Sequence, residues 1–257
     1  MTEAGDSGDP RFAGIARLYG ADGLARLHNA HVAVVGLGGV GSWSVEALAR
    51  SGVGALTLVD LDEVCVSNMN RQLHALENTV GQLKAEALAA RIRLIDPACR
   101  VTVLPTFFKK ANAEEILATR YDFVIDAIDG VAHKARLIGM CKQKGIPVIT
   151  CGAAGGKTDP AAVTIRDLTE TIYDPLMAFI RKRLRKWFQF PRGDRKFGVP
   201  CVFSTEQVFE TPPVACEIRA PGVRANCDYG LGAAAHVTGT FGLVAAGYVV
   251  NRIARGG

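Results

Sequence analysis

Four closely spaced glycines between a predicted strand and a predicted helix constrain the fold most strongly. They follow the β-branched run His31–Val35, and a helical pattern occupies Gly39–Ser51. The four residues are Gly36, Gly38, Gly39 and Gly41. Without side chains, this backbone can approach a pyrophosphate closely, and the amino end of the next helix faces its negative charge. The pattern predicts a nucleotide-binding strand–turn–helix unit.

Strands and helices alternate through the following hundred residues. Further strands are predicted at Leu56–Asp60, Val101–Leu104, Phe123–Ala127 and Val148–Cys151. Helices are predicted at Gly81–Asp96, Asn112–Thr119 and Ala132–Lys144. Alternation with continuously apolar strands indicates a parallel sheet covered on both faces, and right-handed crossovers make it doubly wound. We therefore expect an α/β, mostly parallel, Rossmann-like fold in which residues 1–257 form a single domain.

The flanking segments have their own patterns. An amino-terminal helical arm is predicted over Arg11–Asn29, and another strand over Val163–Leu168. Asp174–Phe190 reads as a basic helix and loop, and Gly193–Pro221 is rich in Pro and Gly, which predicts irregular structure. We expect residues 174–228 to form a basic, partly irregular insertion within the domain.

The tail Leu231–Val250 carries no formal charge and is long enough to cross a bilayer. Polar residues interrupt it: His236, Thr238, Thr240 and Tyr248. These interruptions favour a buried helix or a dimer-interface helix over a membrane span.

Cysteine usage indicates a cellular compartment. The seven cysteines are scattered and never spaced Cys-x-x-Cys, and the leader Met1–Asp9 is polar. This pattern argues for a reducing cytoplasm, and against both a disulfide framework and a four-thiolate zinc site. The net charge of +5 does not by itself indicate a nucleic-acid partner.

The residues after the second strand narrow the nucleotide class. Asp60 ends that strand, where a carboxylate can accept both ribose hydroxyls, an arrangement that users of NAD, FAD and ATP share. Arg71 follows among polar residues, including Asn68 and Gln72, and Lys84 lies shortly beyond. A hydride-transferring enzyme needs apolar room here, whereas two cations suit a triphosphate attacked at its α-phosphate.

Two carboxylates close the fourth strand. Asp126 and Asp129 lie where the order of strands is expected to reverse. Magnesium is usually held by one or two carboxylates together with substrate phosphates, and Asp129 is the candidate. We expect one of the two to have a turn or capping role instead.

The segment from Arg181 to Lys196 holds eight cations against one acid. The candidate RNA contacts in it are Arg181, Lys182, Arg183, Arg185, Lys186 and Trp187. Cations neutralise phosphates and aromatic faces stack unpaired bases, although charge runs are usually solvated helix faces.

These motifs resemble those of the ubiquitin-activating, ThiF-type superfamily, which adenylates carboxylates. The matching residues are Gly36-x-Gly38-Gly39-x-Gly41, Asp60-x-Asp62, Asn68-x-x-Arg71-Gln72, Lys84 and Asp126-x-x-Asp129. Within it, the chain from Arg11 to Val250 looks most like the tRNA threonylcarbamoyladenosine dehydratases. The closer markers are Arg11-Phe12, Ala16–Gly20, Gly152–Gly156 and Cys201–Glu206.

The resemblance implies residue roles. ATP or its magnesium would be bound by Gly39, Asp60, Ser67, Asn68, Arg71, Lys84 and Asp129. Arg17 would reach the nucleotide of a partner subunit, which implies a homodimer. The family reaction cyclises the threonylcarbamoyl side chain of an adenosine beside the anticodon, with loss of water. The sequence does not decide whether the Gly152–Gly156 loop binds a monovalent cation.

The sequence allows alternative interpretations of Cys227 and of the function. Cys227 aligns with a family cysteine that accepts sulfur or responds to redox state, which would bring in a sulfur-transfer partner; a spectator thiol is the alternative. The main alternative function is adenylation of the C-terminus of a ubiquitin-like sulfur-carrier protein. An NAD-linked oxidoreductase conflicts with Arg71 and Lys84, and a non-catalytic nucleotide sensor conflicts with these two residues and Asp129.

Overall fold

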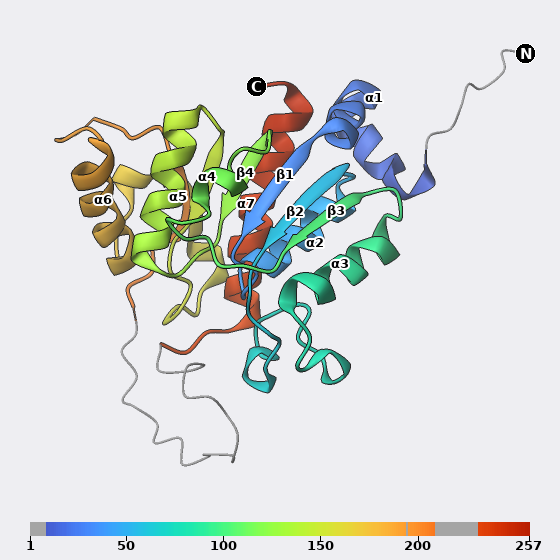
Figure 1. Ribbon diagram of the computed structural model, residues 1–257, viewed down its shortest axis with the longest axis horizontal. Coiled ribbons are helices and arrows are strands. Elements are labelled where there is room, and N and C mark those ends of the chain that lie inside the picture. The colour runs from blue at the N-terminus through green and yellow to red at the C-terminus, as the bar shows by residue number, and fades with distance from the viewer. Residues whose placement is uncertain (1–8, 194, 209–230) are drawn as a thin grey trace, which may run out of the picture.

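One seven-stranded sheet organises the computed structural model, which describes residues 9–193, 195–208 and 231–257 (Figure 1). The strand order is β3-β2-β1-β4-β5-β7-β6, and every neighbouring pair is parallel except β6 and β7. The strands are β1 (His31–Val35), β2 (Ala55–Val59), β3 (Arg100–Leu104), β4 (Phe123–Asp126), β5 (Val148–Cys151), β6 (Val163–Asp167) and β7 (Pro200–Ser204). The predicted doubly wound α/β fold is confirmed.

Helices cover both faces of the sheet. They are α1 (Ala13–Asn29), α2 (Gly41–Arg50), α3 (Lys84–Ile95), α4 (Ala113–Ile116), α5 (Val131–Lys144), α6 (Pro175–Phe188) and α7 (Ala235–Arg255). One core cluster joins the sheet to α2, α3 and α7; a second joins the other face to α4 and α5; a third packs α5, α6 and β7 together. The apolar residues of the inner strands β1, β2, β4 and β5 are buried on both faces, as a parallel sheet requires.

The chain order places a switch point between β1 and β4. From β1 the chain moves outward to β2 and β3, then returns to add β4 on the other side of β1. Gly36 follows β1, Asp60 follows β2 and Asp126 ends β4, so all three lie at the carboxyl edge of the sheet. Open α/β sheets bind their ligands in the crevice at such a point.

The expectation of irregular structure across Gly193–Pro221 is wrong for β7. This strand is hydrogen-bonded to β5 on one side and to β6 on the other, and Cys201 and Phe203 are buried. Pro200 is tolerated because it is the first residue of the strand. The remainder of that range from residue 209 lies outside the described residues.

The uncharged tail forms most of α7. This helix packs against α2, α1 and four strands, and Val237, Phe241 and Val249 are fully buried. A Cβ atom on Gly242 would lie 2.4 Å from the carbonyl oxygen of Val40, so the glycine allows close approach to α2. The buried-helix interpretation is confirmed. Across the described ranges, no helix combines the length and apolar character that a membrane crossing requires.

Candidate functional site

The glycine turn after β1 is shaped by contacts that exclude side chains. Gly36 has φ +89°, and a Cβ atom there would lie 2.7 Å from the carbonyl oxygen of Ala127. A Cβ atom on Gly41 would lie 1.8 Å from the carbonyl oxygen of Gly36. No side chain of the described residues caps the amino end of α2. The turn therefore offers bare backbone and a positive helix end, which fit a phosphate group.

Asp60 is held beside this turn by two backbone donors. Its Oδ2 accepts a hydrogen bond from the Leu37 amide at 2.6 Å, and its Oδ1 accepts one from the Asp62 amide at 2.9 Å. Burial raises the pKa of this carboxyl, while the two amides and Lys84 oppose that rise. Each oxygen keeps a lone pair, so the group has the acceptor capacity that a ribose diol requires.

Lys84 begins α3 and is anchored to the segment after β2. Its Nζ lies 3.0 Å from Oδ2 of Asp62, and its backbone amide donates to the Asp62 carbonyl at 2.9 Å. An antiparallel bridge between Glu63 and Leu83 fastens the same two segments. The ammonium group is thereby placed close to the Asp60–Asp62 turn, with only 6% of the residue exposed.

Arg71 is positioned through its backbone by residues that the sequence did not single out for this role. Its carbonyl oxygen accepts hydrogen bonds from Nε1 of Trp43 on α2 at 3.1 Å and from Oγ1 of Thr238 on α7 at 3.3 Å. Its Nη1 donates to the Ser67 carbonyl and to Oδ1 of Asn70, both at 2.8 Å. Thr238 also packs against Gly39, so the tail helix supports both the glycine turn and Arg71.

The polar residues around Arg71 divide into two groups. Asn68 is buried and its Oδ1 accepts the Cys65 amide at 3.0 Å, so it shapes the turn. Ser67 Oγ and Gln72 Oε1 are buried and have no hydrogen-bond partner in the part of the chain that the structure describes. Gln72 Nε2 lies 3.9 Å from the position that a Cβ atom on Gly38 would take. Buried acceptors that lack a partner beside the glycine turn are consistent with a polar ligand.

His74 is a residue that the sequence reasoning missed. It is 2% exposed, and neither ring nitrogen has a hydrogen-bond partner among the described residues. Burial, reinforced by the charge of Lys84, lowers the pKa of its imidazole to about 4. The imidazole is therefore neutral at physiological pH. In the sequence, only its position two residues after Gln72 indicated that His74 lies near the candidate site.

The two aspartates after β4 have different environments. Asp126 is fully buried and accepts hydrogen bonds from Oγ1 of Thr150 at 2.7 Å and the Ile128 amide at 3.1 Å. Its Oδ2 also lies 3.1 Å from Nζ of Lys134. Asp129 is exposed, and within the described ranges no hydrogen bond or ion pair engages its carboxylate. Asp126 has the structural role, which leaves Asp129 available to a cation.

The structure does not bring Arg17 to the glycine turn of its own chain. Arg17 is exposed on α1, which packs against the carboxyl end of α7: Arg26 Nε donates to the Ala254 carbonyl at 3.0 Å. Thr238, at the other end of α7, contacts the glycine turn. Ala254 lies sixteen positions after Thr238, which corresponds to about 24 Å along the helix. Helix α1 therefore packs at the end of α7 that is remote from the glycine turn.

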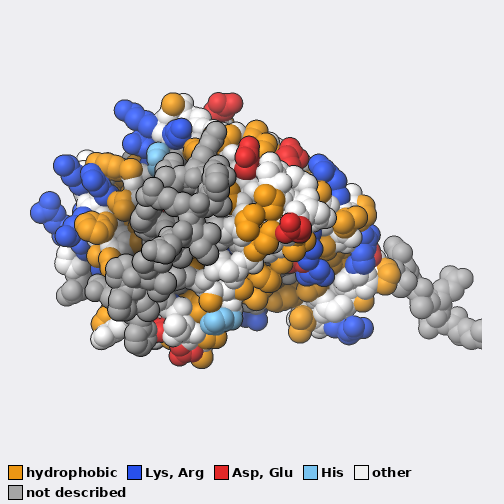
Figure 2. All heavy atoms as spheres, turned by 90° about the horizontal axis from the view of Figure 1, so that it is seen from below, with side chains coloured by type: hydrophobic (Ala, Val, Ile, Leu, Met, Phe, Trp, Pro, Cys, Tyr) orange, Lys and Arg blue, Asp and Glu red, His pale blue; other side chains and the backbone are white. Residues whose placement is uncertain are grey.

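The basic segment divides into inward and outward cations. Arg181 Nη1 donates to the Leu168 carbonyl at 3.3 Å, and Arg185 Nε donates to the Pro191 carbonyl at 3.1 Å. The exposed members on α6 are Lys182, Arg183, Lys186 and Trp187. Figure 2 shows Lys and Arg side chains gathered at the end of the molecule where α6 lies in Figure 1.

Two guanidinium groups contact the ring of Trp187. Arg183 lies over its ring, 5.0 Å from the centroid, and Arg136 of α5 lies 5.6 Å from it. Arg136 was not predicted, because only the packing of α5 against α6 brings it to this face. We call Arg136, Lys182, Arg183, Lys186 and Trp187 the α6 basic face.

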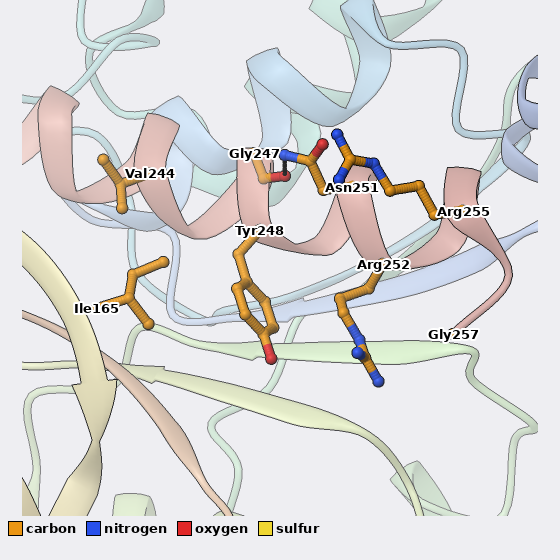
Figure 3. Close-up of a pocket in the computed structure, with 8 residues that line it drawn as sticks. All are labelled: Ile165, Val244, Gly247, Tyr248, Asn251, Arg252, Arg255 and Gly257. Carbon is orange, nitrogen blue, oxygen red and sulfur yellow. Dashed lines mark hydrogen bonds between the residues drawn. The ribbon is translucent and has the colours of Figure 1, made fainter. Parts of the chain in front are cut away.

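Two cavities lie away from the glycine turn. One, of about 530 Å³, runs along the carboxyl half of α7, where Tyr248 and Arg252 extend toward the strands (Figure 3). The other, of about 770 Å³, lies at the start of α6 and is lined by Tyr173 and Arg181. Asp174 there accepts the Ala153 amide at 2.9 Å, which holds the Gly152–Gly156 loop.

The described cysteines offer no activated nucleophile in the core. Burial raises the pKa of the Cys99 thiol to about 11, and of the Cys141 and Cys151 thiols to about 12. It raises the pKa of Cys201 as well. Cys227 lies outside the described residues. In residues 9–193, 195–208 and 231–257, no group of three or more His, Cys, Asp or Glu side chains is arranged to hold a metal.

Comparison with known proteins agrees with this geometry. The ThiF family model matches residues 12–255. A tRNA threonylcarbamoyladenosine dehydratase of Haemophilus influenzae is 48% identical over 96% of this chain and 95% of its own length. The crystal structure of the Escherichia coli tRNA N6-threonylcarbamoyladenosine dehydratase in complex with ATP superposes with a TM-score of 0.85, at 47% identity, covering 95% of this chain and 93% of that one. The same E. coli enzyme is known in complex with AMP, with a TM-score of 0.84.

Similarity to enzymes that activate sulfur carriers is more distant. The molybdopterin-synthase adenylyltransferase of E. coli is 36% identical over 54% of this chain and 55% of its own length.

Proposed function

Because the chain belongs to the ThiF family and, within it, to the tRNA threonylcarbamoyladenosine dehydratases, we propose that it is an ATP-dependent enzyme that cyclises threonylcarbamoyladenosine in tRNA. The observation that carries the proposal is the carboxyl edge of the sheet. There the glycine turn lies beside Asp60, and Arg71 is fixed from α2 and α7. Lys84 is tied to the segment after β2. This set suits a nucleoside triphosphate better than a dinucleotide.

The reaction needs an activated carboxylate because the bare group has no adequate leaving group. The threonyl carboxylate attacks the α-phosphorus of ATP, pyrophosphate leaves, and a mixed anhydride with AMP forms. The carbamoyl nitrogen of the same side chain then attacks the carbonyl carbon. AMP departs with the former carboxylate oxygen, a proton is released and the ring closes. Ring closure within one side chain gains from proximity, so no protein nucleophile is needed.

The chain's own residues stabilise the charge that develops on the phosphates. Arg71 and Lys84 supply positive charge, Asp60 accepts the ribose hydroxyls, and the amino end of α2 faces the phosphates. Ser67, Asn68 and Gln72 complete the polar wall of this site. Asp129 would hold magnesium, which when bound neutralises phosphate charge and favours departure of pyrophosphate.

The tRNA partner calls for a cationic surface, and the α6 basic face supplies one. Its cations neutralise phosphates, and Trp187 offers an aromatic ring. Arg181 and Arg185 are occupied by contacts within the chain, so we assign them to holding α6 in place. RNA contact then falls to Arg136, Lys182, Arg183 and Lys186 with Trp187.

We also propose a homodimer in which Arg17 reaches the nucleotide site of the partner subunit. The separation of α1 from the glycine turn within one chain supports it, as does the exposure of Leu18 beside Arg17, at 75%. Sulfur transfer at Cys227, a monovalent cation in the Gly152–Gly156 loop and a cytoplasmic location stay predictions.

The test is direct. Purified protein is incubated with ATP, magnesium and tRNA that carries threonylcarbamoyladenosine, and the nucleosides are analysed by mass spectrometry. We expect the loss of one water from that nucleoside, with AMP and pyrophosphate formed. Arg71→Ala and Lys84→Ala should abolish turnover while the circular dichroism spectrum stays unchanged. ADP in place of AMP would contradict adenylation, and turnover only with a ubiquitin-like carrier protein would contradict the proposed function.

A further inference from the structure

We propose that Lys134 is a positioning residue that fixes the turn from Asp126 to Asp129, and through it the direction of the Asp129 carboxylate. The inference rests on the proposed function, because Asp129 is the magnesium ligand in that proposal. Lys134 lies in the first turn of α5, directly after this segment. Both Lys134 and Asp126 are fully buried.

All the hydrogen-bond donors of the Lys134 ammonium group are used by acceptors in the turn from Asp126 to Asp129. Its Nζ lies 3.1 Å from Oδ2 of Asp126, and donates to the Asp126 carbonyl at 3.2 Å and to the Ile128 carbonyl at 2.9 Å. An ammonium group has three donors, and all three have acceptors here. Two of these acceptors are backbone carbonyls, so the lysine fixes the path of the chain as well as pairing with one side chain.

The same turn forms the back of the nucleotide site. The Ala127 amide donates to the Val35 carbonyl at 2.9 Å, and the Ala127 carbonyl oxygen lies 2.7 Å from the position that a Cβ atom on Gly36 would take. Asp126 in turn accepts the Ile128 amide. Residues 126, 127 and 128 are therefore each fixed, and Asp129 is the first residue of the segment that projects outward.

Stability alone does not account for the buried pair. Removing two charges from water costs several kcal/mol for each ion, and well-packed apolar residues of similar volume often serve stability equally well. An apolar pair would leave the Ile128 carbonyl without its donor. What the ion pair adds is a defined backbone geometry ahead of Asp129. Residues that orient a metal ligand in this way typically change metal affinity by 10- to 100-fold when removed.

The test measures ATP affinity by calorimetry with and without magnesium, which requires no tRNA. In the wild type, magnesium should strengthen ATP binding, and Asp129→Asn should lose that gain. Lys134→Met should reduce the gain by about tenfold, a size typical of lost support for a metal ligand. The double variant Asp126→Asn/Lys134→Met removes the unpaired buried charge, so it should fold more stably than Lys134→Met yet show the same reduced gain.

Leu137→Ala is the matched structural control. Leu137 is fully buried on the same helix, and we expect its truncation to lower stability without changing the magnesium gain. An unchanged gain in the folded double variant, or an equal loss in Leu137→Ala, would overturn the inference. So would a wild type that binds ATP equally with and without magnesium, in which case the dehydration assay still decides the proposed function separately.

Discussion

The wild-type protein should lose stability as the pH falls from 6.5 to 4, and replacing His74 with leucine should abolish a large part of that loss. The folded imidazole has a pKa lowered to about 4, against an ordinary value of 6.5. Between these values the unfolded chain binds a proton that the folded chain does not. Falling pH therefore favours unfolding throughout this window, and the loss is complete below pH 4.

The size of the effect follows from the two pKa values. The fall from 6.5 to about 4, at about 1.4 kcal/mol for each unit of pKa, corresponds to about 3 kcal/mol. This is a large share of the roughly 5–15 kcal/mol that stabilises a typical domain. The leucine variant has no proton to bind in either state. Above pH 6.5 it should be as stable as the wild type or more so, because a buried polar group without a partner is replaced by an apolar one.

Urea unfolding followed by tryptophan fluorescence, at steps from above pH 6.5 down to pH 4, measures the difference. The free energies of unfolding of the wild type and His74→Leu should diverge as the pH falls, with the wild type losing about 3 kcal/mol more than the variant. His28→Gln serves as the control, because this ring is exposed and its variant should follow the wild type. Parallel curves for the wild type and His74→Leu would refute the reasoning.

Three further predictions concern the turn, the helix packing and the α6 basic face. Gly36→Ala should weaken ATP binding by about tenfold or more in calorimetry, because the new Cβ atom adds a clash to the roughly 1–2 kcal/mol of left-handed strain. The control is Gly145→Ala, where φ is +69° but the space around the glycine is open, and ATP binding should be unchanged. An equal loss in this control would contradict the prediction. Gly139→Ala should lower the thermal midpoint, because the new Cβ would lie 2.4 Å from the ring of Phe188, with a typical overpacking cost of about 1–3 kcal/mol; an unchanged midpoint would contradict the packing. Arg183→Glu should weaken tRNA binding and lower its salt dependence in filter binding while ATP binding stays unchanged; unaltered tRNA affinity would remove Arg183 from the proposed surface.

The fold was predictable because its signals are local. The glycine turn, the alternating apolar runs and the breaks at Pro and Gly each act within a few residues, and they predicted β1 to β6 and the helices. β7 was not recognised, because Pro200 and the nearby glycines resemble loop composition. Its strand conformation depends on pairing with β5 and β6, which lie far away in the sequence.

The structure holds Asp60 beside the glycine turn, Arg71 against α2 and α7, and Lys84 against the segment after β2, but the residues that support them were not predictable. Trp43 and Thr238 reach Arg71 from helices separated by nearly two hundred residues. Lys134 looks like an ordinary surface residue, since lysine is almost never fully buried. Only the structure separates Asp126 from Asp129, because the difference between them is that one has a buried cation beside it.

The sequence also does not distinguish neighbouring residues among the candidate RNA contacts. Arg181 and Lys182 are adjacent in sequence, yet consecutive residues on a helix point about 100° apart. Arg181 turns toward the Leu168 carbonyl and Lys182 toward solvent. The two side chains have the same charge, but their positions on the helix give them different surroundings.

The position of α7 in the chain affects when the nucleotide site is completed during synthesis. Thr238 near the start of this helix supports both the glycine turn and the Arg71 carbonyl, yet the turn itself is translated about two hundred residues earlier. A nascent chain that ends before α7 has the sheet but lacks this support. The glycine turn and the Arg71 carbonyl therefore gain this support only once α7 has been synthesised and packed.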